Sequence, residues 1–121
     1  MLDIGASPHG YALERALDLG AAEYVGVGLD VDQPVEVLGH ESLGLLLPMN
    51  AEQLAFEDEG FDAVLSMSTF EHVQDVPAVL REINRVLRRR RKALITFEPV
   101  WTCSYGHHLH HFGAISQHMP D

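Results

Sequence analysis

The chain has 121 residues, which suits one domain, and its 46% hydrophobic and 21% charged residues are an ordinary globular balance. The formal net charge of −10 disfavours nonspecific binding to nucleic acid. No run approaches the roughly 18 apolar residues that span a bilayer, and no basic segment precedes an apolar run as in a signal peptide. We therefore expect a soluble, cytoplasmic protein that binds neither nucleic acid nor membrane. The single cysteine, Cys103, cannot form an internal disulfide bond.

The first half of the chain predicts strands that alternate with helices. Gly5 ends an apolar opening strand, Gly20 is a natural stop for the first helix, and Asp30 ends the second strand. The segment from 31 to 44 has little pattern, and a short helix is expected within it. The expected elements are a strand at 1–5, a helix at 10–19, a strand at 23–30, a short helix near 34–40 and a short strand within 45–51.

The second half predicts two buried strands around a helix. Residues 61–69 form a continuous apolar run of strand length, which is typical of a strand covered on both faces. Residues 75–88 show clear helical spacing, with Asp75 as N-cap and Pro77 in the first turn. Residues 92–100 form another buried strand, which Pro99 stops.

Five of the eight basic residues are consecutive: Arg88, Arg89, Arg90, Arg91 and Lys92. We interpret this run as a solvated helix end, where cations suit the negative C-terminus of the helix dipole. A local patch for RNA or an anionic membrane is the alternative.

The mostly alternating order of strands and helices predicts an α/β fold, with a mainly parallel sheet of about five strands and helices on both faces. In such sheets ligands bind beyond the carboxyl ends of the strands, where the strand order reverses. The loops that follow residues 5, 30, 50, 69 and 98 are therefore the candidates for a binding site.

Two of these loops have residue types that suit a nucleoside ligand. The glycine turn of residues 5–10 allows a ligand close to the backbone, but Ser7 stands where a dinucleotide fingerprint has its middle glycine. The carboxylate of an amino-acid ligand needs less room than a pyrophosphate. Asp30 lies 20 residues after Gly10 and can accept hydrogen bonds from both hydroxyls of a ribose. An acid in this place is otherwise a turn or cap residue.

The next two loops extend the predicted site. Asn50 and the backbone near Ala51 can meet the edge of an adenine, or Asn50 can serve as a cap or turn residue. A set of small and flexible side chains closes the strand at 61–69 and can line a pocket: Ser66, Met67 and Ser68. His72 follows closely and could act as a base near neutral pH, or it could be a polar helix-start residue bonded to the backbone.

Taken in order, four blocks resemble the class I S-adenosylmethionine-dependent methyltransferases, most closely the small-molecule branch often called methyltransferase type 11. They are "LDIGASPHG", "GVGLD", "NAEQLAFEDEGFDAVLSMSTFEHV" and "VLREINRVLRRRRKALITFEP". The resemblance implies a Rossmann-like core over residues 1–100 with the methyl donor over the strand ends. It assigns Asp3, Gly5 and Gly10 to the amino-acid end of the donor, Asp30 to the ribose, Asn50, Ala51 and Glu52 to the adenine, and Ser66, Met67 and Ser68 to the sulfonium and methyl.

The sequence also departs from that family. Ser7 and Pro8 stand where relatives commonly carry a small residue, and Asn50 stands where they carry aspartate. The arginine run stands where relatives have a Pro-Gly-Gly turn, so no turn residue stops the preceding helix. We expect the helix to continue into the run. The chain begins inside the first strand and ends without the C-terminal hairpin of the family. We therefore expect a shortened chain that self-associates through the uncovered side of its sheet.

The segment 101–121 is a histidine-rich tail. His107 has helical spacings to His110 and His111, and such pairs can ligate zinc or nickel, with Cys103 or His118 as a third ligand. The alternatives without metal are an incidental cluster of histidines and a loop that faces the acceptor, in which Trp101, Tyr105 and His107 would contribute stacking and hydrogen bonds.

The sequence thus predicts an enzyme that moves a methyl group from S-adenosylmethionine to a small-molecule acceptor. An oxygen nucleophile would need a base, for which His72 is the first candidate and His107 the second. The alternative is a shortened, non-catalytic relative that acts through association or weak donor binding. A nicotinamide-dependent oxidoreductase is disfavoured by Ser7 and Pro8 in the glycine turn and by the block that begins at Asn50.

Overall fold

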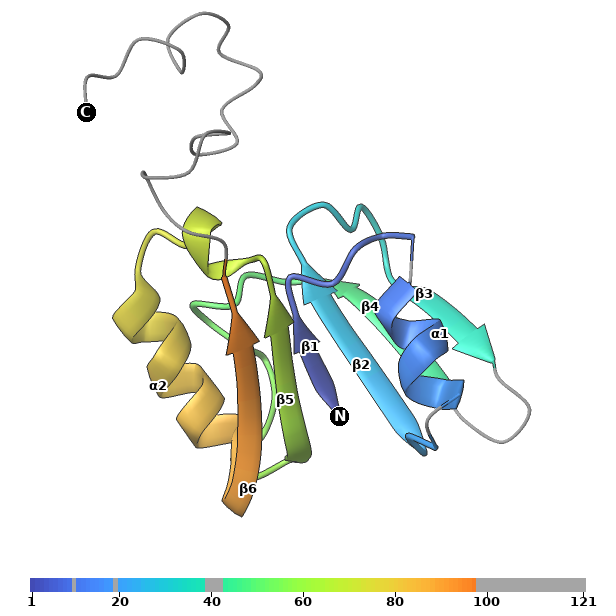
Figure 1. Ribbon diagram of the computed structural model, residues 1–121. Helices are drawn as coiled ribbons and strands as arrows, with labels where there is room; N and C mark the ends of the chain where they lie inside the picture. Colours follow the sequence, from blue (N-terminus) through green and yellow to red (C-terminus); the bar gives the residue numbers. More distant parts are fainter. Residues whose placement is uncertain (10, 19, 39–42, 98–121) are drawn as a thin grey trace, which may run out of the picture.

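The computed structural model describes residues 1–9, 11–18, 20–38 and 43–97, and in these ranges six strands form one sheet (Figure 1). The strands are β1 (Leu2–Ile4), β2 (Glu23–Gly28), β3 (Val35–Leu38), β4 (Leu43–Pro48), β5 (Phe61–Met67) and β6 (Leu87–Thr96). The helices are α1 (Tyr11–Asp18) and α2 (Val76–Val86), and η1 (Phe70–His72) is a 3-10 turn. The sheet order is β3-β4-β2-β1-β5-β6, and every pair except β3–β4 is parallel.

The predicted α/β class with a mainly parallel sheet is confirmed, but the described residues hold six strands rather than about five. The additional strand is β3, and the prediction of a short helix near 34–40 is wrong. Val35, Glu36 and Val37 alternate β-branched and polar side chains, which suits a strand. Antiparallel pairing with β4, from Val35 opposite Leu46 onward, gives its backbone groups partners that a lone helical turn would lack.

The two helices follow the predicted pattern. In α2 the Asp75 side chain accepts a hydrogen bond from the backbone N–H of Ala78 at 2.9 Å, which caps the helix, and Pro77 lies in the first turn. Gly20 follows α1 with a φ of +90°, in the left-handed region that favours glycine. The helix predicted for 75–88 ends at Val86, two residues early, because Leu87 already pairs with Phe61 of β5.

The arginine run is not a helix end, so the interpretation as cations at a helix C-terminus and the expected overrun of the helix are both wrong. The whole run lies in β6, whose pairing with β5 has a register shift between Phe61 and Ala63. Arg90 has a φ of +62°, at the position of this irregularity. Acidic side chains near the start of β5 hold the extended arginines in ion pairs: Arg88–Asp62 at 2.8 Å, Arg89–Glu59 at 3.0 Å and Arg91–Asp62 at 3.1 Å.

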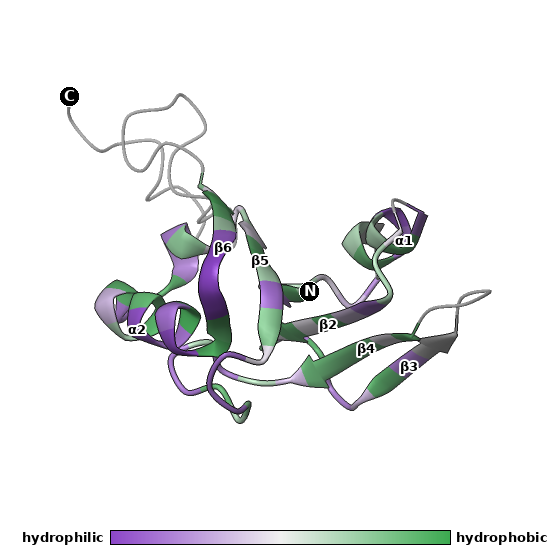
Figure 2. Cartoon of the chain, turned by 90° about the horizontal axis from the view of Figure 1, so that it is seen from below, coloured by the Kyte–Doolittle hydropathy of each residue, from purple (hydrophilic) through white to green (hydrophobic). Residues whose placement is uncertain are grey.

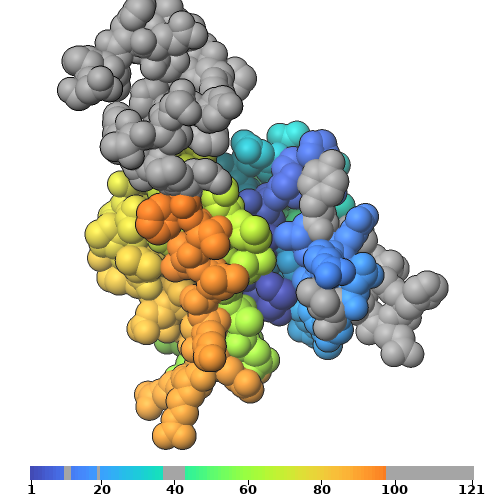
Figure 3. All heavy atoms as spheres, in the orientation of Figure 1, coloured from blue at the N-terminus to red at the C-terminus, as the bar shows by residue number. Residues whose placement is uncertain are grey.

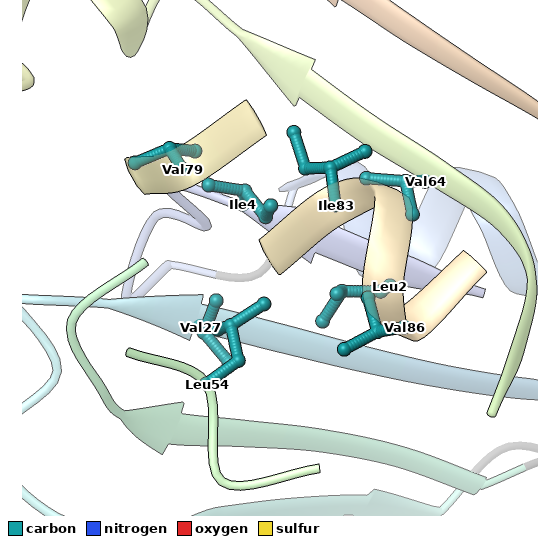
Figure 4. Packing of buried hydrophobic residues seen from close by; sticks show 8 residues of the cluster. All are labelled: Leu2, Ile4, Val27, Leu54, Val64, Val79, Ile83 and Val86. Carbon is teal, nitrogen blue, oxygen red and sulfur yellow. The ribbon is translucent and has the colours of Figure 1, made fainter. Parts of the chain in front are cut away.

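Each face of the sheet packs against one helix, and α1 and α2 lie on opposite sides (Figure 2). The alternation along β1 sends Leu2 and Ile4 to the α2 face and Asp3 to the α1 face. The α2 face buries the larger cluster (Figure 4): Leu2, Ile4, Val27, Leu54, Val64, Val79, Ile83 and Val86. The α1 face buries Ala6, Leu13, Tyr24, Val31 and Leu46.

Of the helices that the structure describes, neither has the length and apolar character that a membrane crossing requires.

Candidate functional site

A cavity of about 640 Å³ opens at the carboxyl ends of the parallel strands. It lies beside β1, where the strand order reverses. From β1 the chain continues to β2 and β4 on one side, and from β4 it crosses over to β5 on the other side of β1. Loops far apart in the sequence form its walls: residues 5–6, 27–30, 49–52, 68–69 and 72–74, together with Val79 of α2. The volume is within the roughly 300–1,000 Å³ of small-molecule sites.

The glycine turn after β1 is fixed by its neighbours on both sides. Gly5 has a φ of +82°, and the N–H groups of Gly5 and Ala6 both donate to the Val27 carbonyl oxygen, at 2.8 and 3.0 Å. A Cβ on Gly5 would stand 2.0 Å from Oγ1 of Thr69, so only glycine fits there. The Thr69 hydroxyl bonds the carbonyl oxygen of Ile4 at 3.2 Å and so ties the ends of β1 and β5 together.

Gly28, at the end of β2, is also a position where a side chain would not fit. A Cβ on this residue would stand 2.7 Å from the Ala6 carbonyl oxygen. The absence of a side chain therefore lets the turn after β1 lie directly against β2. As a result, the backbone of this turn and the carboxylate of Asp30 lie at one cavity.

The structure brings seven of the predicted site residues to the cavity wall: Gly5, Asp30, Asn50, Ala51, Glu52, Ser68 and His72. Asn50 also has the turn role that the sequence left open, since its Oδ1 accepts a hydrogen bond from the Glu52 N–H at 2.9 Å. Ser68 has a φ of +49°, in the left-handed region that residues other than glycine seldom adopt. Their contacts with a donor stay predictions.

Three other predicted residues do not line the cavity. Asp3 is buried, and its carboxylate accepts a hydrogen bond from the Tyr24 hydroxyl on the α1 face. Burial raises the pKa of Asp3, which the hydrogen bond from Tyr24 opposes, and burial together with Asp3 raises the pKa of Tyr24. Ser66 is fully buried and donates to the Ile4 carbonyl oxygen at 3.0 Å, whereas Met67 is 57% exposed.

The remaining predicted residues, Gly10 and His107, lie outside the described residues, as does the rest of the histidine tail. Within the described ranges, no three His, Cys, Asp or Glu side chains come together as metal ligands.

His72 ends η1 at the cavity wall, and its backbone N–H donates to the Thr69 carbonyl oxygen at 2.9 Å. The imidazole side chain is exposed. Both carboxylate oxygens of the preceding Glu71 are shielded from solvent and have no hydrogen-bond partner among the described residues. The position of His72 at the wall suits a group that takes a proton from a bound molecule.

Sequence reasoning missed the apolar part of the wall. Val73 and Val79 line the cavity, and Leu29 lines it although its side chain is 78% exposed. Val79 also packs in the core cluster of the α2 face. The signal that could have found Leu29 is its place beside Asp30, directly after β2.

A cavity over the carboxyl ends, a glycine turn after the first strand and an acid after the second are features of a Rossmann-like fold. The sequence profile of a family described as a methyltransferase domain matches residues 2–95, and the chain belongs to this family. By fold and family the chain thus belongs to the class I S-adenosylmethionine-dependent methyltransferases, and S-adenosylmethionine is the cofactor that goes with that fold.

Known relatives agree with this assignment. The chain is 29% identical over 110 residues to an uncharacterized methyltransferase of Mycolicibacterium vanbaalenii, which covers 89% of this chain and 42% of the relative. It is similar to the YcgJ protein of Bacillus subtilis, at 25% identity and a TM-score of 0.66 over 84% of this chain and 44% of that one. It is also similar to phosphoethanolamine N-methyltransferase 2 of Haemonchus contortus in complex with S-adenosylmethionine, at 27% identity and a TM-score of 0.66 over 84% and 24%. The chain therefore spans less than half the length of these relatives.

Proposed function

We propose that this chain binds S-adenosylmethionine in the cavity at the carboxyl ends of the strands and transfers its methyl group to a small-molecule acceptor. The observation that carries the proposal is the meeting of three loops at one cavity: the Gly5 turn, the Asp30 loop and residues 49–52. These loops are far apart in the sequence, and the resemblance assigned each of them to a different part of the same donor.

The residues present suit the parts of that molecule. The backbone of Gly5 and Ala6 borders the cavity where the amino-acid end would lie, and the exposed carboxylate of Asp30 can accept hydrogen bonds from the two ribose hydroxyls. Met49, Ala51 and Val79 form an apolar wall on which a flat adenine can lie.

When bound, S-adenosylmethionine supplies a methyl group that is already activated by its sulfonium. The chain's own task is then to bind donor and acceptor, to align them and to exclude water. For an acceptor with a hydroxyl group, we propose His72 at the wall as the base that takes the proton. His107 is the second candidate.

Calorimetry with S-adenosylhomocysteine, the product form of the donor, tests the proposal. We expect binding by the wild-type protein, and we expect Asp30→Ala to weaken it by roughly 1–3 kcal/mol because hydrogen bonds to a charged group are lost. Asp32→Ala is the matched control, because Asp32 is a neighbouring exposed acid that does not line the cavity, and it should bind as the wild type does.

A folded wild-type protein that does not bind S-adenosylhomocysteine would overturn the proposal and favour a non-catalytic relative that acts through association. An equal loss in Asp30→Ala and Asp32→Ala would contradict the assignment of Asp30 to the ribose.

A further inference from the structure

We infer that Glu82 and Arg85 of α2 are positioning residues for the cavity: together they hold the loop of residues 49–60, which supplies one wall. Neither side chain lines the cavity, so they act through the loop and not by contact with a bound molecule. The inference rests on the proposed function for the part that concerns the donor.

The loop of residues 49–60 contains only turns and irregular backbone, so its backbone polar groups need partners from elsewhere. Side chains of α2 supply them at Leu54. The N–H of Leu54 donates to Oε2 of Glu82 at 2.7 Å, and its carbonyl oxygen accepts from Nη2 of Arg85 at 2.8 Å. The Leu54 side chain is 5% exposed and packs in the core cluster with Val79 and Ile83, so this residue anchors the loop by its backbone and its side chain.

The Arg85 guanidinium has five N–H donors, and the structure uses all five. Nε bonds Glu82 Oε1 at 2.9 Å, and Nη2 bonds Glu82 Oε2 at 2.8 Å. Nη1 bonds the Phe56 carbonyl oxygen at 2.6 Å and Asp58 Oδ1 at 2.8 Å, and the fifth bond is the one to Leu54. A lysine amine is a point charge without this planar fork and cannot reproduce the set.

The carboxylate of Glu82 is kept ionised by the same arrangement. Hydrogen bonding from Arg85 lowers the pKa of Glu82, with a smaller contribution from the Leu54 N–H, while desolvation acts in the opposite direction. Glu82 therefore remains an acceptor for both Leu54 and Arg85 near neutral pH.

The other end of the loop is also tied to the scaffold. The N–H of Met49 donates to the Gly28 carbonyl oxygen at 3.3 Å, and Oε1 of Glu52 accepts from the N–H of Asp75, the N-cap of α2, at 3.1 Å. The wall residues 49–52 thus lie between this end and the Leu54 anchor. If the wall had to become ordered on binding, the lost conformational entropy would weaken the affinity. A wall that is already ordered in the free protein avoids this loss.

The test compares Arg85→Lys with the wild type by amide hydrogen exchange and by calorimetry with S-adenosylhomocysteine. Arg85→Lys keeps the charge but loses the fork, so we expect the Leu54 and Glu52 amides to exchange about tenfold faster. We expect the affinity for S-adenosylhomocysteine to fall about 3- to 30-fold. Arg88→Lys is the matched control, because Arg88 pairs with Asp62 and with the Glu59 carbonyl oxygen at the far end of the same loop, away from Leu54 and the wall residues 49–52, so both measurements should stay unchanged.

Unchanged exchange at Leu54 and Glu52 in Arg85→Lys would overturn the inference. Faster exchange with unchanged affinity would overturn it as well, because the loop would then move without affecting the wall. If the wild type does not bind S-adenosylhomocysteine, the proposed function fails, and exchange at Glu52 alone decides whether the pair positions the wall. Should Arg85→Lys not fold, Glu82→Gln replaces it. Glutamine keeps the shape of the side chain but removes the negative charge to which Leu54 N–H and Arg85 donate.

Discussion

The two faces of the sheet differ in how completely they are covered. On the α2 face, one helix packs over β1, β2 and β5 and closes a cluster of eight buried residues. On the α1 face, α1 packs over β2, and the buried cluster involves β2 and β4 and not β5 or β6. Leu94 of β6 and Met67 of β5 lie on this face and are 60% and 57% exposed; within the described residues no helix covers β5 and β6 there, and we call this the open surface (Figure 3).

The described residues thus bury a full core on the α2 face, whereas on the α1 face they leave β5 and β6 uncovered. The α2 face holds both the main core and the Glu82–Arg85 pair, so the adenine side of the proposed site is supported within this chain. The α1 face has a smaller core and a buried polar pair, Asp3 and Tyr24, and it ends before β5. We therefore expect mutations on the two faces to have different consequences.

The largest effect is expected on the α2 face. Ile83→Ala leaves a cavity in the main cluster and should lower the free energy of unfolding by about 2–5 kcal/mol. Leu80→Ala is the control on the same helix, because Leu80 is 46% exposed and its truncation should cost less than about 1 kcal/mol. Urea denaturation followed by circular dichroism gives both values, and similar losses at the two positions would contradict the assignment of the core to this face.

A smaller and pH-dependent effect is expected on the α1 face. Burial raises the folded pKa of Asp3 above its ordinary 3.8, so its contribution to stability is full below that value and is lost as the pH rises through the raised pKa. The Tyr24 hydroxyl limits this loss by donating to the carboxylate. Tyr24→Phe should therefore cost about 1–3 kcal/mol at neutral pH, and the cost should shrink as the solution is acidified.

Urea denaturation of the wild type and of Tyr24→Phe, from neutral pH down to below the ordinary Asp3 pKa of 3.8, measures the effect. Asp3→Asn is the control, because an amide does not ionise in this pH range. In the Asp3→Asn background, the free-energy cost of Tyr24→Phe should no longer depend on pH. A cost that is the same at acidic and neutral pH would show that the ionised carboxylate is not what the hydroxyl stabilises.

The smallest effect on stability is expected at the open surface over β5 and β6. Leu94→Glu should change the free energy of unfolding by less than about 1 kcal/mol, because Leu94 is largely exposed. If the predicted self-association uses this surface, the same change should reduce the mass measured by light scattering, whereas Leu80→Glu on α2 should not. A wild-type protein that is a monodisperse monomer would show that the prediction of self-association is wrong.

Several parts of the fold could be predicted from short-range patterns. The apolar runs around β1, β2 and β5, the helical spacing of α2 and its Asp75 cap all act within a few residues. Together with the rule that ligands bind at carboxyl ends, they located Gly5, Asp30 and the loops after β4 and β5. The segments with weak or misleading local patterns, β3 and the arginine run, were predicted incorrectly because their state depends on distant partners.

The sequence by itself determined the order of strands and helices apart from β3, the family and the loops that carry the proposed site, because periodicity, caps and glycine turns are local properties. Only the tertiary structure decided that the arginines extend along β5 beside Asp62 and Glu59, that Asp3 turns to Tyr24, and that α2 holds the Leu54 loop. Each of these depends on hydrogen bonds and ion pairs between residues more than 20 positions apart along the chain. Such contacts form only when the whole sheet sets their distances.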